Sequence, residues 1–420
     1  MHNQTGFLIT LLIFALLEYY SFVALNVSMR SYPLGVRYTV FGVYSLVSII
    51  VWICLFTFRS WSFSESHPSL RIFLICFVMG FLAAKVLVAV FMILDDLRRL
   101  ITWCIRYLTA FFPQTPKDPV EIPNGISRST FLARMAILAG GLLLGGFLYG
   151  PKNRYRYVIK RHRIKLKNLP DAFQGLKIVH ISDIHAGSFD NVEAVAHGVD
   201  LILKEQADMI VFTGDLVNNA ATEIEPYIDV FSKLKAPMGV YSTLGNHDYG
   251  DYIQWPSATA KAENLELLKA HHARMGWRLL MNEHIIFERS SQKLALIGVE
   301  NWSNLARFPK HGDLAKAYSG LEHEPVSAKI LLSHDPTHWD AQIRKEFADI
   351  DLTLSGHTHG MQFGLRLPWM KWSPVQYIYN QWAGLYQEGS QYINVNVGYG
   401  FLGYPGRLGI LPEITVIELE

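Results

Sequence analysis

The sequence predicts a globular α/β domain preceded by an all-α bundle of about four transmembrane helices. Apolar side chains dominate up to about residue 150, and charges are sparse there. From Leu176 onward, short apolar strands alternate with amphipathic helices. We therefore expect a membrane anchor over residues 1–151, a basic juxtamembrane linker over residues 152–175 and a globular domain over residues 176–420.

The anchor contains four stretches long enough to cross a bilayer, because a spanning helix needs roughly 20 mainly apolar residues. The four are Gly6–Val27, Tyr38–Phe58, Ile72–Leu94 and Phe131–Tyr149. Apolar residues recur at helical spacing over residues 97–108, which favours a separate helix lying in the headgroup plane. Four prolines between residues 113 and 123 then predict a loop. Together these features predict a multi-pass protein of the cell membrane.

Two charged residues lie inside predicted spans, Glu18 in the first and Lys85 in the third. Such charges can mark a transport path. The simpler interpretation is favoured, because Glu18 is near enough to a span end to reach the interface, and Lys85 can be buried against another helix or snorkel. A transporter regulated by the globular domain is a weaker alternative, since the helices show no obvious repeat.

The side of the membrane that carries the globular domain depends on two competing groups of charges. With the N-terminus inside, the eight Lys and Arg residues of Lys152–Lys167 and the domain are cytoplasmic; with it outside, the basic third loop is cytoplasmic and the domain is exported. Arg128 and Arg134, followed by the run Ala139-Gly140-Gly141, resemble an export signal, although a twin-arginine pair is missing and an ordinary membrane helix also fits. We predict an extracytoplasmic domain.

Charge and cysteine usage exclude several classes of function. The formal net charge is +2 and no basic stretch of the globular part is interleaved with aromatic side chains, so no nucleic-acid partner is expected. All three cysteines, Cys54, Cys76 and Cys104, lie in the anchor. The globular part therefore has no disulfide framework, thiol nucleophile or cysteine-based zinc site.

Strands and helices alternate in the globular part, as in an α/β sheet. The predicted strands are Leu176–Ser182, Met209–Thr213, Val240–Leu244, Leu294–Val299, Lys329–Ser333 and Asp351–Ser355. The predicted helices are Asn191–Glu205, Glu225–Leu234, Ala258–Met275 and Trp339–Phe347. The last strands, Tyr392–Val397 and Ile414–Leu419, have no helix between them, which predicts an antiparallel end to the sheet.

Five short motifs rich in metal-binding side chains follow one another along the globular part, and most begin where a predicted strand ends. They are Asp183-Ile184-His185, Gly214-Asp215-Leu216, Gly245-Asn246-His247-Asp248, Ser333-His334-Asp335 and Gly356-His357-Thr358-His359-Gly360. Open α/β sheets place their ligands at that end of the strands. Carboxylate, amide and imidazole donors together suit divalent manganese, iron or zinc. The motifs therefore predict one metal centre, and their glycines permit the tight turns it needs.

These motifs resemble those of the calcineurin-like metallophosphoesterases, and the resemblance covers residues 176–420. The runs Gly398-Tyr399-Gly400 and Pro405–Ile414 resemble the membrane-associated bacterial phosphodiesterase branch. The family implies a four-layer αββα sandwich with two divalent metal ions near its centre. The implied ligands are Asp183, His185, Asp215 and His359 for one metal, and Asp215, Asn246, His334 and His357 for the other.

The resemblance also implies a mechanism without a covalent intermediate. Two cations acidify a bridging water, so that a metal-held hydroxide attacks the phosphorus in line. His247 matches the family position that protonates the leaving alkoxide, and we expect Asp248 to hold its ring in the required tautomer. Of the remaining polar residues, we expect His180 in the core and Arg407 either on a substrate phosphate or on the surface.

The predicted function is hydrolysis of a phosphodiester or phosphomonoester by a domain tethered to a membrane. Tethering raises the effective concentration of lipid headgroups, so membrane lipids and a lipid-linked or cell-envelope phosphate ester are the expected partners. Two alternatives stay open. One is a pyrophosphatase for a nucleotide-linked lipid precursor of the UDP-diacylglucosamine type at the cytoplasmic face. The other is a catalytically silent membrane sensor, which the complete set of predicted ligands disfavours.

Overall fold

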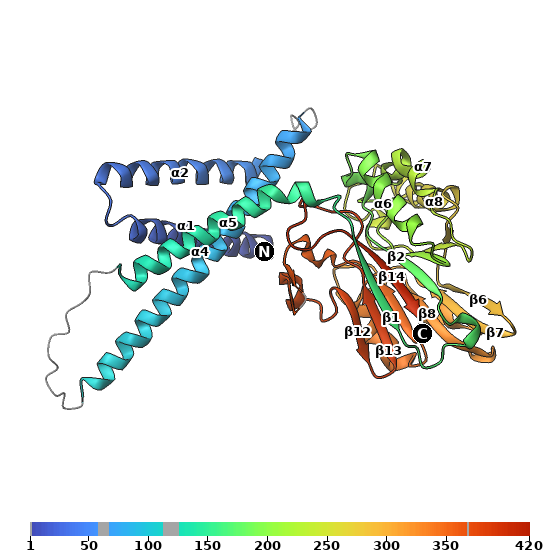
Figure 1. The fold of residues 1–420 in the computed structure, drawn as a ribbon. Helices are drawn as coiled ribbons and strands as arrows, with labels where there is room; N and C mark the ends of the chain where they lie inside the picture. Colours follow the sequence, from blue (N-terminus) through green and yellow to red (C-terminus); the bar gives the residue numbers. More distant parts are fainter. Residues whose placement is uncertain (1, 58–66, 112–125, 368) are drawn as a thin grey trace. The chain divides into compact units, whose positions relative to one another are not determined.

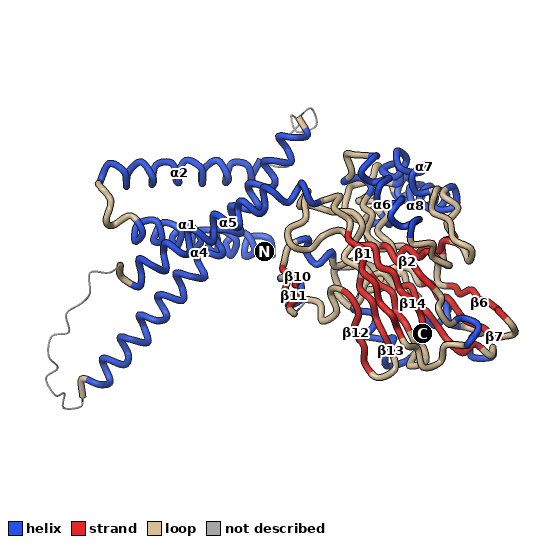
Figure 2. The backbone as a smooth tube through the Cα atoms, in the orientation of Figure 1, coloured by secondary structure: helices blue, strands red, loops and turns tan. Residues whose placement is uncertain are grey.

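The computed structural model describes residues 2–57, 67–111, 126–367 and 369–420. The chain forms two compact units, Met1–Tyr149 and Gly150–Glu420. The first is helical and the second contains the sheets (Figures 1 and 2). The predicted loop over the prolines of residues 113–123 lies outside the described residues.

Four helices of the described part of the first unit are long and apolar enough to cross a membrane, which confirms the predicted spans. They are α1 (His2–Ser28), α2 (Leu34–Thr57), α4 (Pro68–Thr109) and α5 (Arg128–Tyr149). The separate helix expected over residues 97–108 is wrong, because α4 continues through these residues without a break. After Pro68, the stretch up to residue 109 contains no further proline and no pair of glycines, so nothing in it would end the helix.

A polar cluster joins three of these helices. The ammonium of Lys85 on α4 contacts the carboxylate of Glu18 on α1 and lies 2.7 Å from Ser48 Oγ on α2. Glu18 also accepts hydrogen bonds from the hydroxyl of Tyr44 at 2.7 Å and the indole N–H of Trp52 at 3.0 Å. The predicted burial of Lys85 against another helix is confirmed. Each charge has its counter-charge on a neighbouring helix, which offsets the cost of removing it from water.

The second unit is built on two mixed sheets of six strands in its described part. One has the order β1-β14-β2-β3-β4-β5 and the other β12-β13-β9-β8-β7-β6. The strands of the first are β1 (Val158–Ile164), β14 (Glu413–Leu419), β2 (Lys177–Ile181), β3 (Met209–Phe212), β4 (Val240–Ser242) and β5 (Arg278–Leu279). Those of the second are β12 (Gly384–Glu388), β13 (Gln391–Val395), β9 (Leu352–Ser355), β8 (Val326–Leu332), β7 (Gln292–Gly298) and β6 (Glu283–Arg289). As predicted, β14 runs antiparallel to its neighbour β2, whereas β13 pairs parallel with β9.

The basic segment at the start of this unit is part of the sheet. The structure therefore corrects the expectation of a linker over residues 152–175. Residues Val158–Ile164 form β1, which pairs in parallel with β14 along its full length. The exposed side chains of Arg161 and Arg163 alternate with the half-buried or buried ones of Lys160, His162 and Ile164, and Ile164 is 1% exposed. An edge strand rich in Lys and Arg tolerates this pattern, because one face of the strand is open to water.

Alternation along the central strands builds two cores. On β3, Met209 and Val211 face the other sheet, while Ile210 and Phe212 face outward. The inward set meets Leu294, Ile330 and Leu354 of the second sheet. This period of two is what a strand buried on both faces requires.

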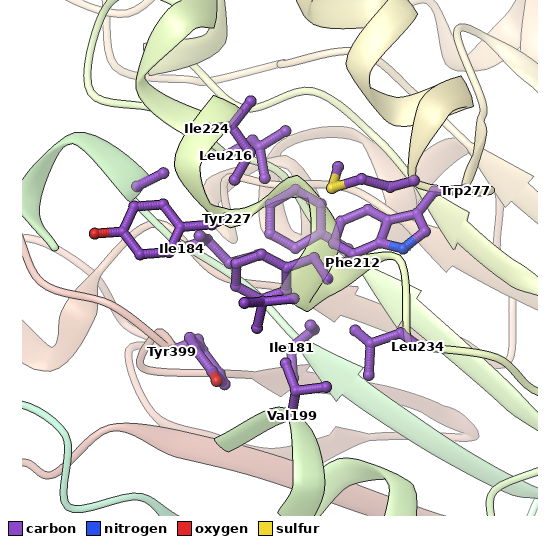
Figure 3. Packing of buried hydrophobic residues seen from close by; sticks show 14 of the residues in the cluster. Ile181, Ile184, Val199, Phe212, Leu216, Ile224, Tyr227, Leu234, Trp277 and Tyr399 are labelled. Carbon is purple, nitrogen blue, oxygen red and sulfur yellow. The ribbon is translucent and has the colours of Figure 1, made fainter. Parts of the chain in front are cut away.

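Helices cover both outer faces of the paired sheets. On the first sheet lie α6 (Val192–Lys204), α7 (Ile228–Phe231) and α8 (Ala258–Arg274), as Figure 1 shows. Their apolar faces meet the outward residues of β2 and β3, and Figure 3 shows Phe212 beside Trp277, with ring centroids 5.5 Å apart. On the second sheet lie α9 (Leu314–Tyr318) and the helical segment 339–346. The four layers confirm the predicted αββα sandwich.

Candidate metal centre

The five motifs meet at one edge of the two sheets. Strands β2, β3 and β4 are parallel to one another, and so are β8 and β9. The carboxyl ends of parallel strands fall on the same side, and each motif follows directly after one of these five ends. All the predicted ligands except His357 are less than 10% exposed. The fold therefore concentrates buried polar side chains at one place.

The structure gathers six of the seven predicted ligands into two groups. The first contains Asp183, His185 and His359, and the second contains Asp215, His334 and His357; within each group the ligand atoms all lie within 4.8 Å of one another. Asp215 Oδ2 lies 3.5 Å from His185 Nε2 and 3.2 Å from His334 Nε2. This carboxylate oxygen therefore stands between the two groups, where a bridging ligand has to be.

Hydrogen bonds outside the two groups fix the ring orientations. His334 donates from Nδ1 to the carbonyl of Thr213 at 2.7 Å, and His185 Nδ1 lies 3.1 Å from the side-chain oxygen of Asn218. His357 is held the other way round, with Nε2 2.9 Å from the hydroxyl of Tyr379. In each ring the remaining nitrogen faces the interior of the site, as in metal-binding histidines.

Several buried ligand atoms have no hydrogen-bond partner within the described part of the chain. They are His185 Nε2, His359 Nε2 and Asn246 Oδ1. The amide nitrogen of Asn246 donates a hydrogen bond to the hydroxyl of Tyr252 at 2.7 Å. The amide oxygen is therefore the atom that can bind a metal ion. Buried polar atoms without partners are costly, and these three are atoms that a bound metal ion would satisfy. Nitrogen and carboxylate donors suit divalent manganese, iron or zinc.

The turns that carry these side chains are strained. Asp183, His185, Asp215, His357 and His359 all have positive φ, between 50° and 71°. Non-glycine residues adopt this conformation rarely, and where they do it is often at functional sites. The strain lets five ligands point from short turns toward a common centre.

Two glycines allow the turns after β3 and β4 to touch. Gly214 has φ of 96°, and a Cβ on it would lie 2.4 Å from the backbone nitrogen of Gly245. A Cβ on Gly245 would lie 2.6 Å from the backbone nitrogen of Asp215. Any side chain at either position would push Asp215 away from the other ligands, as the predicted tight turns require.

The charge balance of the site favours a cation. Burial raises the pKa of the Asp183 carboxyl to about 6 and lowers the pKa of His185 to about 3. Burial also opposes protonation of His334, but the carboxylates of Asp215 and Asp183 outweigh it and raise the pKa of His334 to about 10. The two buried carboxylates thus attract positive charge into the site.

His247 lies at the open side of the centre. Its backbone N–H donates to Asp215 Oδ1 at 2.8 Å, and its Nδ1 donates to the carbonyl of Asn218 at 2.8 Å. The ring packs on Tyr252, with centroids 4.4 Å apart. Because Nδ1 carries the donated proton, Nε2 is the atom available to the reaction, and the half-buried ring can reach a substrate.

Asp248 has a different role from the one expected. Its carboxylate accepts hydrogen bonds from the backbone N–H groups of Asp215 at 2.9 Å, Leu216 at 2.8 Å and Gly245 at 2.8 Å. The orienting partner of His247 is the carbonyl of Asn218 instead. Asp248 is fully buried between the two turns, so the structure corrects its expected role from tautomer control to joining the loops.

Arg407 is neither on a substrate phosphate nor on the surface, because it is completely buried. Its guanidinium donates to the carbonyls of Val397 at 2.8 Å, His359 at 3.3 Å and Gly398 at 3.3 Å, and it also contacts the carbonyl of Gly400. The arginine therefore supports the turn that carries His359. The expectation for His180 is confirmed, since it is buried and its ring lies 2.9 Å from Thr213 Oγ1.

Sequence reasoning missed the residues that surround the ligands. Tyr379, Asn218 and Tyr252 lie outside the five motifs, and single polar residues in loops carry no pattern that would have identified them. An exposed cation was missed as well. Arg307 precedes Phe308, whose ring centroid is 4.7 Å from that of His357, and the Arg307 guanidinium lies over the same Phe308 ring.

Comparisons with known proteins agree with this geometry. Residues 176–361 match the family model described as "Calcineurin-like phosphoesterase", and residues 4–153 match the one described as "Probable Calcineurin-like phosphoesterase, transmembrane domain". The chain is 32% identical over 306 residues to a Bacillus subtilis protein named uncharacterized metallophosphoesterase YkuE, covering 70% of this chain and 98% of the other. It is also 32% identical to a Danio rerio transmembrane protein with metallophosphoesterase domain, covering 76% and 68% of the two chains. Identity to the Escherichia coli phosphodiesterase YaeI is 27%, covering 70% and 99%.

The fold, the donor set and these similarities define a membrane-associated, metal-dependent phosphoesterase. The chain belongs to the calcineurin-like metallophosphoesterases. Its similarity to YkuE and YaeI confirms the predicted resemblance to the bacterial branch. Members of the family use divalent metals, and the two groups of His and Asp residues fit that chemistry.

Proposed function

We propose that the protein hydrolyses a phosphodiester or phosphomonoester of a lipid-linked or cell-envelope substrate. The observation that carries the proposal is the set of buried, unpartnered donor atoms around Asp183 and Asp215, within the described part of the chain. The ligand roles are part of the proposal and follow the family pattern. They are Asp183, His185, Asp215 and His359 for one metal, and Asp215, Asn246, His334 and His357 for the other.

Each part of the chain contributes a separate step. When bound, a pair of divalent cations lowers the pKa of a coordinated water and neutralises phosphoryl oxygens. Asp215 lies between the two groups of ligands, so that one phosphate can contact both metal positions. His247 gives the proton on Nε2 to the oxygen of the leaving group, while the Asn218 carbonyl holds Nδ1–H. Arg307, exposed beside Phe308, binds a phosphate oxygen from the solvent side.

The substrate class follows from the anchor. Four apolar helices keep the domain within reach of a bilayer surface, where lipid headgroups are the most concentrated phosphate esters. We place the domain outside the cytoplasm on the basis of the basic start of α5. Alkaline phosphatase fused after Glu420 is active only outside the cytoplasm, so an active fusion supports export. An inactive fusion favours the cytoplasmic pyrophosphatase alternative.

The activity is tested on the full chain in micelles with bis-p-nitrophenyl phosphate and p-nitrophenyl phosphate, first metal-free and then with manganese. We expect metal-dependent release of p-nitrophenol that Asp215→Ala abolishes. Asp229→Ala is the matched control, since Asp229 is an exposed carboxylate on α7 that belongs to none of the five motifs. Metal binding without any turnover in the wild type would replace the enzyme by the silent sensor.

A further inference from the structure

The hairpin formed by β10 (Leu365–Leu367) and β11 (Met370–Trp372) has its faces reversed relative to a soluble protein. The strands pair antiparallel, with Leu367 opposite Met370 and Arg366 opposite Lys371. The polar pair is tied to the domain, because Arg366 contacts Glu413 and Lys371 donates to the carbonyl of Ala383 at 2.8 Å. Since side chains alternate along a strand, anchoring the polar face leaves the apolar face outward.

The outward face forms a concentrated apolar patch. Leu365, Leu367 and Met370 are between 42% and 48% exposed, and Trp369 at the turn is 80% exposed. Tyr377, which follows β11, is 77% exposed. Seven of the eleven exposed large apolar residues described in residues 150–420 fall between 361 and 378. An exposed patch of this kind on a soluble domain marks a binding surface.

Chain connectivity places this patch beside the membrane anchor point. The last membrane helix, α5, ends at Tyr149, and the candidate span that contains it ends at Asn153, so the chain leaves the bilayer near Gly150. The backbone N–H of Arg407 donates to the carbonyl of Gly150 at 3.1 Å, and Asn153 donates back to the carbonyl of Arg407 at 3.2 Å. The segment at residues 407–408 is therefore fixed next to the anchor point.

The same segment is paired with the start of the hairpin. Leu408 donates its N–H to the carbonyl of Gln362 at 2.8 Å, and Gly364 donates to the carbonyl of Leu408 at 2.9 Å. Neighbouring hydrogen-bonded chains lie about 5 Å apart, so Gly150 and Gly364 are separated by roughly 10 Å. Strand β10 begins at the next residue. The hairpin thus begins close to the residue at which the membrane anchor ends.

The candidate metal centre is connected to the patch through one short helical turn. This turn, His359–Gln362, contains the proposed ligand His359, then Met361, which is 51% exposed, and then Gln362 of the paired segment. The first residues after the anchor add positive charge, since Lys152 and Arg156 are exposed. Tryptophan and tyrosine prefer the interface between water and lipid, and lysine and arginine attract anionic headgroups.

We propose that the β10–β11 hairpin, with Met361 and Tyr377 beside it, is a docking surface for the lipid bilayer. The hairpin inserts Trp369 into the headgroup layer. Docking holds the turn that carries His359 against the membrane, so that a phosphate ester of a lipid headgroup reaches the centre without leaving the bilayer. The docking itself does not depend on catalysis; only its consequence for substrate access rests on the proposed function.

The test measures the depth of the hairpin in lipid, independently of activity. In the full chain with Cys54, Cys76 and Cys104 replaced by Ala, a fluorescent nitrobenzoxadiazole group is attached at Trp369→Cys, and the protein is reconstituted in phosphatidylglycerol and phosphatidylcholine vesicles. Tyr377→Cys is a second labelled position. Leu267→Cys on α8 is the matched control, because Leu267 is 39% exposed and apolar but lies outside the patch. Spin-labelled lipids serve as quenchers.

We expect lipid quenching of the label at residues 369 and 377 and none at residue 267. Absence of lipid quenching at both patch positions would overturn the proposal, and so would equal quenching at Leu267. A label shielded from aqueous iodide but not quenched by lipid would also overturn it, because a second protein copy would then cover the patch.

A second measurement addresses substrate access. The double variant Leu367→Asp and Trp369→Asp is compared with Leu267→Asp on a diacylglycerol p-nitrophenyl phosphate ester within the vesicles and on soluble bis-p-nitrophenyl phosphate. We expect a loss of about a hundredfold or more on the lipid ester alone for the double variant, because two large apolar side chains that would enter the headgroup layer are replaced by charged ones. An equal rate on the lipid ester would refute the role in access. Absence of all turnover in the wild type would count against the proposed function and leave the quenching result as the test of docking.

Discussion

The carboxylate of Asp248 accepts a hydrogen bond from the backbone N–H of Asp215, 2.9 Å away. The same oxygen accepts from the N–H of Gly245 at 2.8 Å, and the other oxygen accepts from Leu216 at 2.8 Å. One buried side chain thus joins the turns after β3 and β4, and it fixes the residue that stands between the two ligand groups.

Asp248→Asn tests this joining role. The amide of asparagine presents N–H groups where two backbone N–H donors need an acceptor, so we expect the variant to lose about 1 to 3 kcal/mol of stability. Manganese affinity should fall with it, because Asp215 is no longer held. Calorimetry of the full chain in micelles checks the first effect and metal titration the second. An unchanged unfolding temperature with reduced turnover would restore the tautomer role instead.

His247→Gln separates proton donation from metal binding. Glutamine keeps a polar side chain of similar length but cannot protonate an alkoxide. We expect normal metal content and a loss of roughly 10² to 10⁴ in turnover on alkyl phosphodiesters, with a much smaller loss on p-nitrophenyl esters, whose leaving group needs no proton. The ratio of the two rates is the measurement. A similar loss on both substrates would assign His247 to positioning only.

Arg407→Lys tests the structural role of the buried guanidinium. A lysine ammonium cannot reach the carbonyls of Val397, His359 and Gly398 at once, so we expect a loss of about 2 to 3 kcal/mol of stability. The turn that carries His359 should loosen, and manganese should bind more weakly to the variant. A raised KM at unchanged unfolding temperature would be the signature of a substrate contact and would contradict the structural role.

Arg307→Ala tests the exposed cation beside the centre. The guanidinium lies over Phe308, next to His357, where a phosphate oxygen of the substrate can reach it. We expect KM for bis-p-nitrophenyl phosphate to rise about tenfold while kcat stays near the wild-type value, since a charge-assisted hydrogen bond is lost in both ground and transition states. Arg274→Ala, an exposed arginine on α8, is the control and should leave both constants unchanged.

His272 makes the fold sensitive to acid. Burial lowers the pKa of this histidine to about 3, while the unfolded chain keeps its usual value of about 6.5. Below pH 6.5 the unfolded state takes up a proton that the folded state refuses, so stability falls as the pH falls. At pH 5.5 the cost is about 1.4 kcal/mol relative to neutral pH. His272→Asn, which can still bond Ser242, should show a smaller drop in unfolding temperature between pH 7.5 and 5.5. Equal drops would show that other groups control the acid lability.

The alternating α/β pattern was predictable because its central strands are apolar on both faces, whereas the four-layer sandwich was implied by the family resemblance. Met209–Phe212 is buried at every position, and a short apolar run of this kind, followed directly by a turn, favours a buried strand. Strand β1 was not predictable, since Val158–Ile164 is half charged and pairs only at an edge, with a partner about 250 residues away in the sequence. The hairpin of β10 and β11 was not predictable either, because its strands are short and their apolar residues face outward.

The candidate site divides in the same way. Asp183, Asp215 and His334 were identifiable because each follows a strand end and offers a side chain that metals bind. The roles of Asp248 and Arg407 were not, because they depend on backbone N–H and carbonyl groups that the sequence does not display. Residue identity predicts what can bind a metal, whereas the support of a turn depends on where the backbone passes.

The ion pair between Glu18 and Lys85 has a consequence for biosynthesis. The two residues are 67 positions apart, so the ribosome delivers the glutamate first and the lysine roughly 3 to 13 seconds later. During that interval the first helix carries an acidic group that lipid does not accept and that its partner cannot yet neutralise. We therefore expect the polar contacts that join the first three helices to be completed only after the third span has been synthesised.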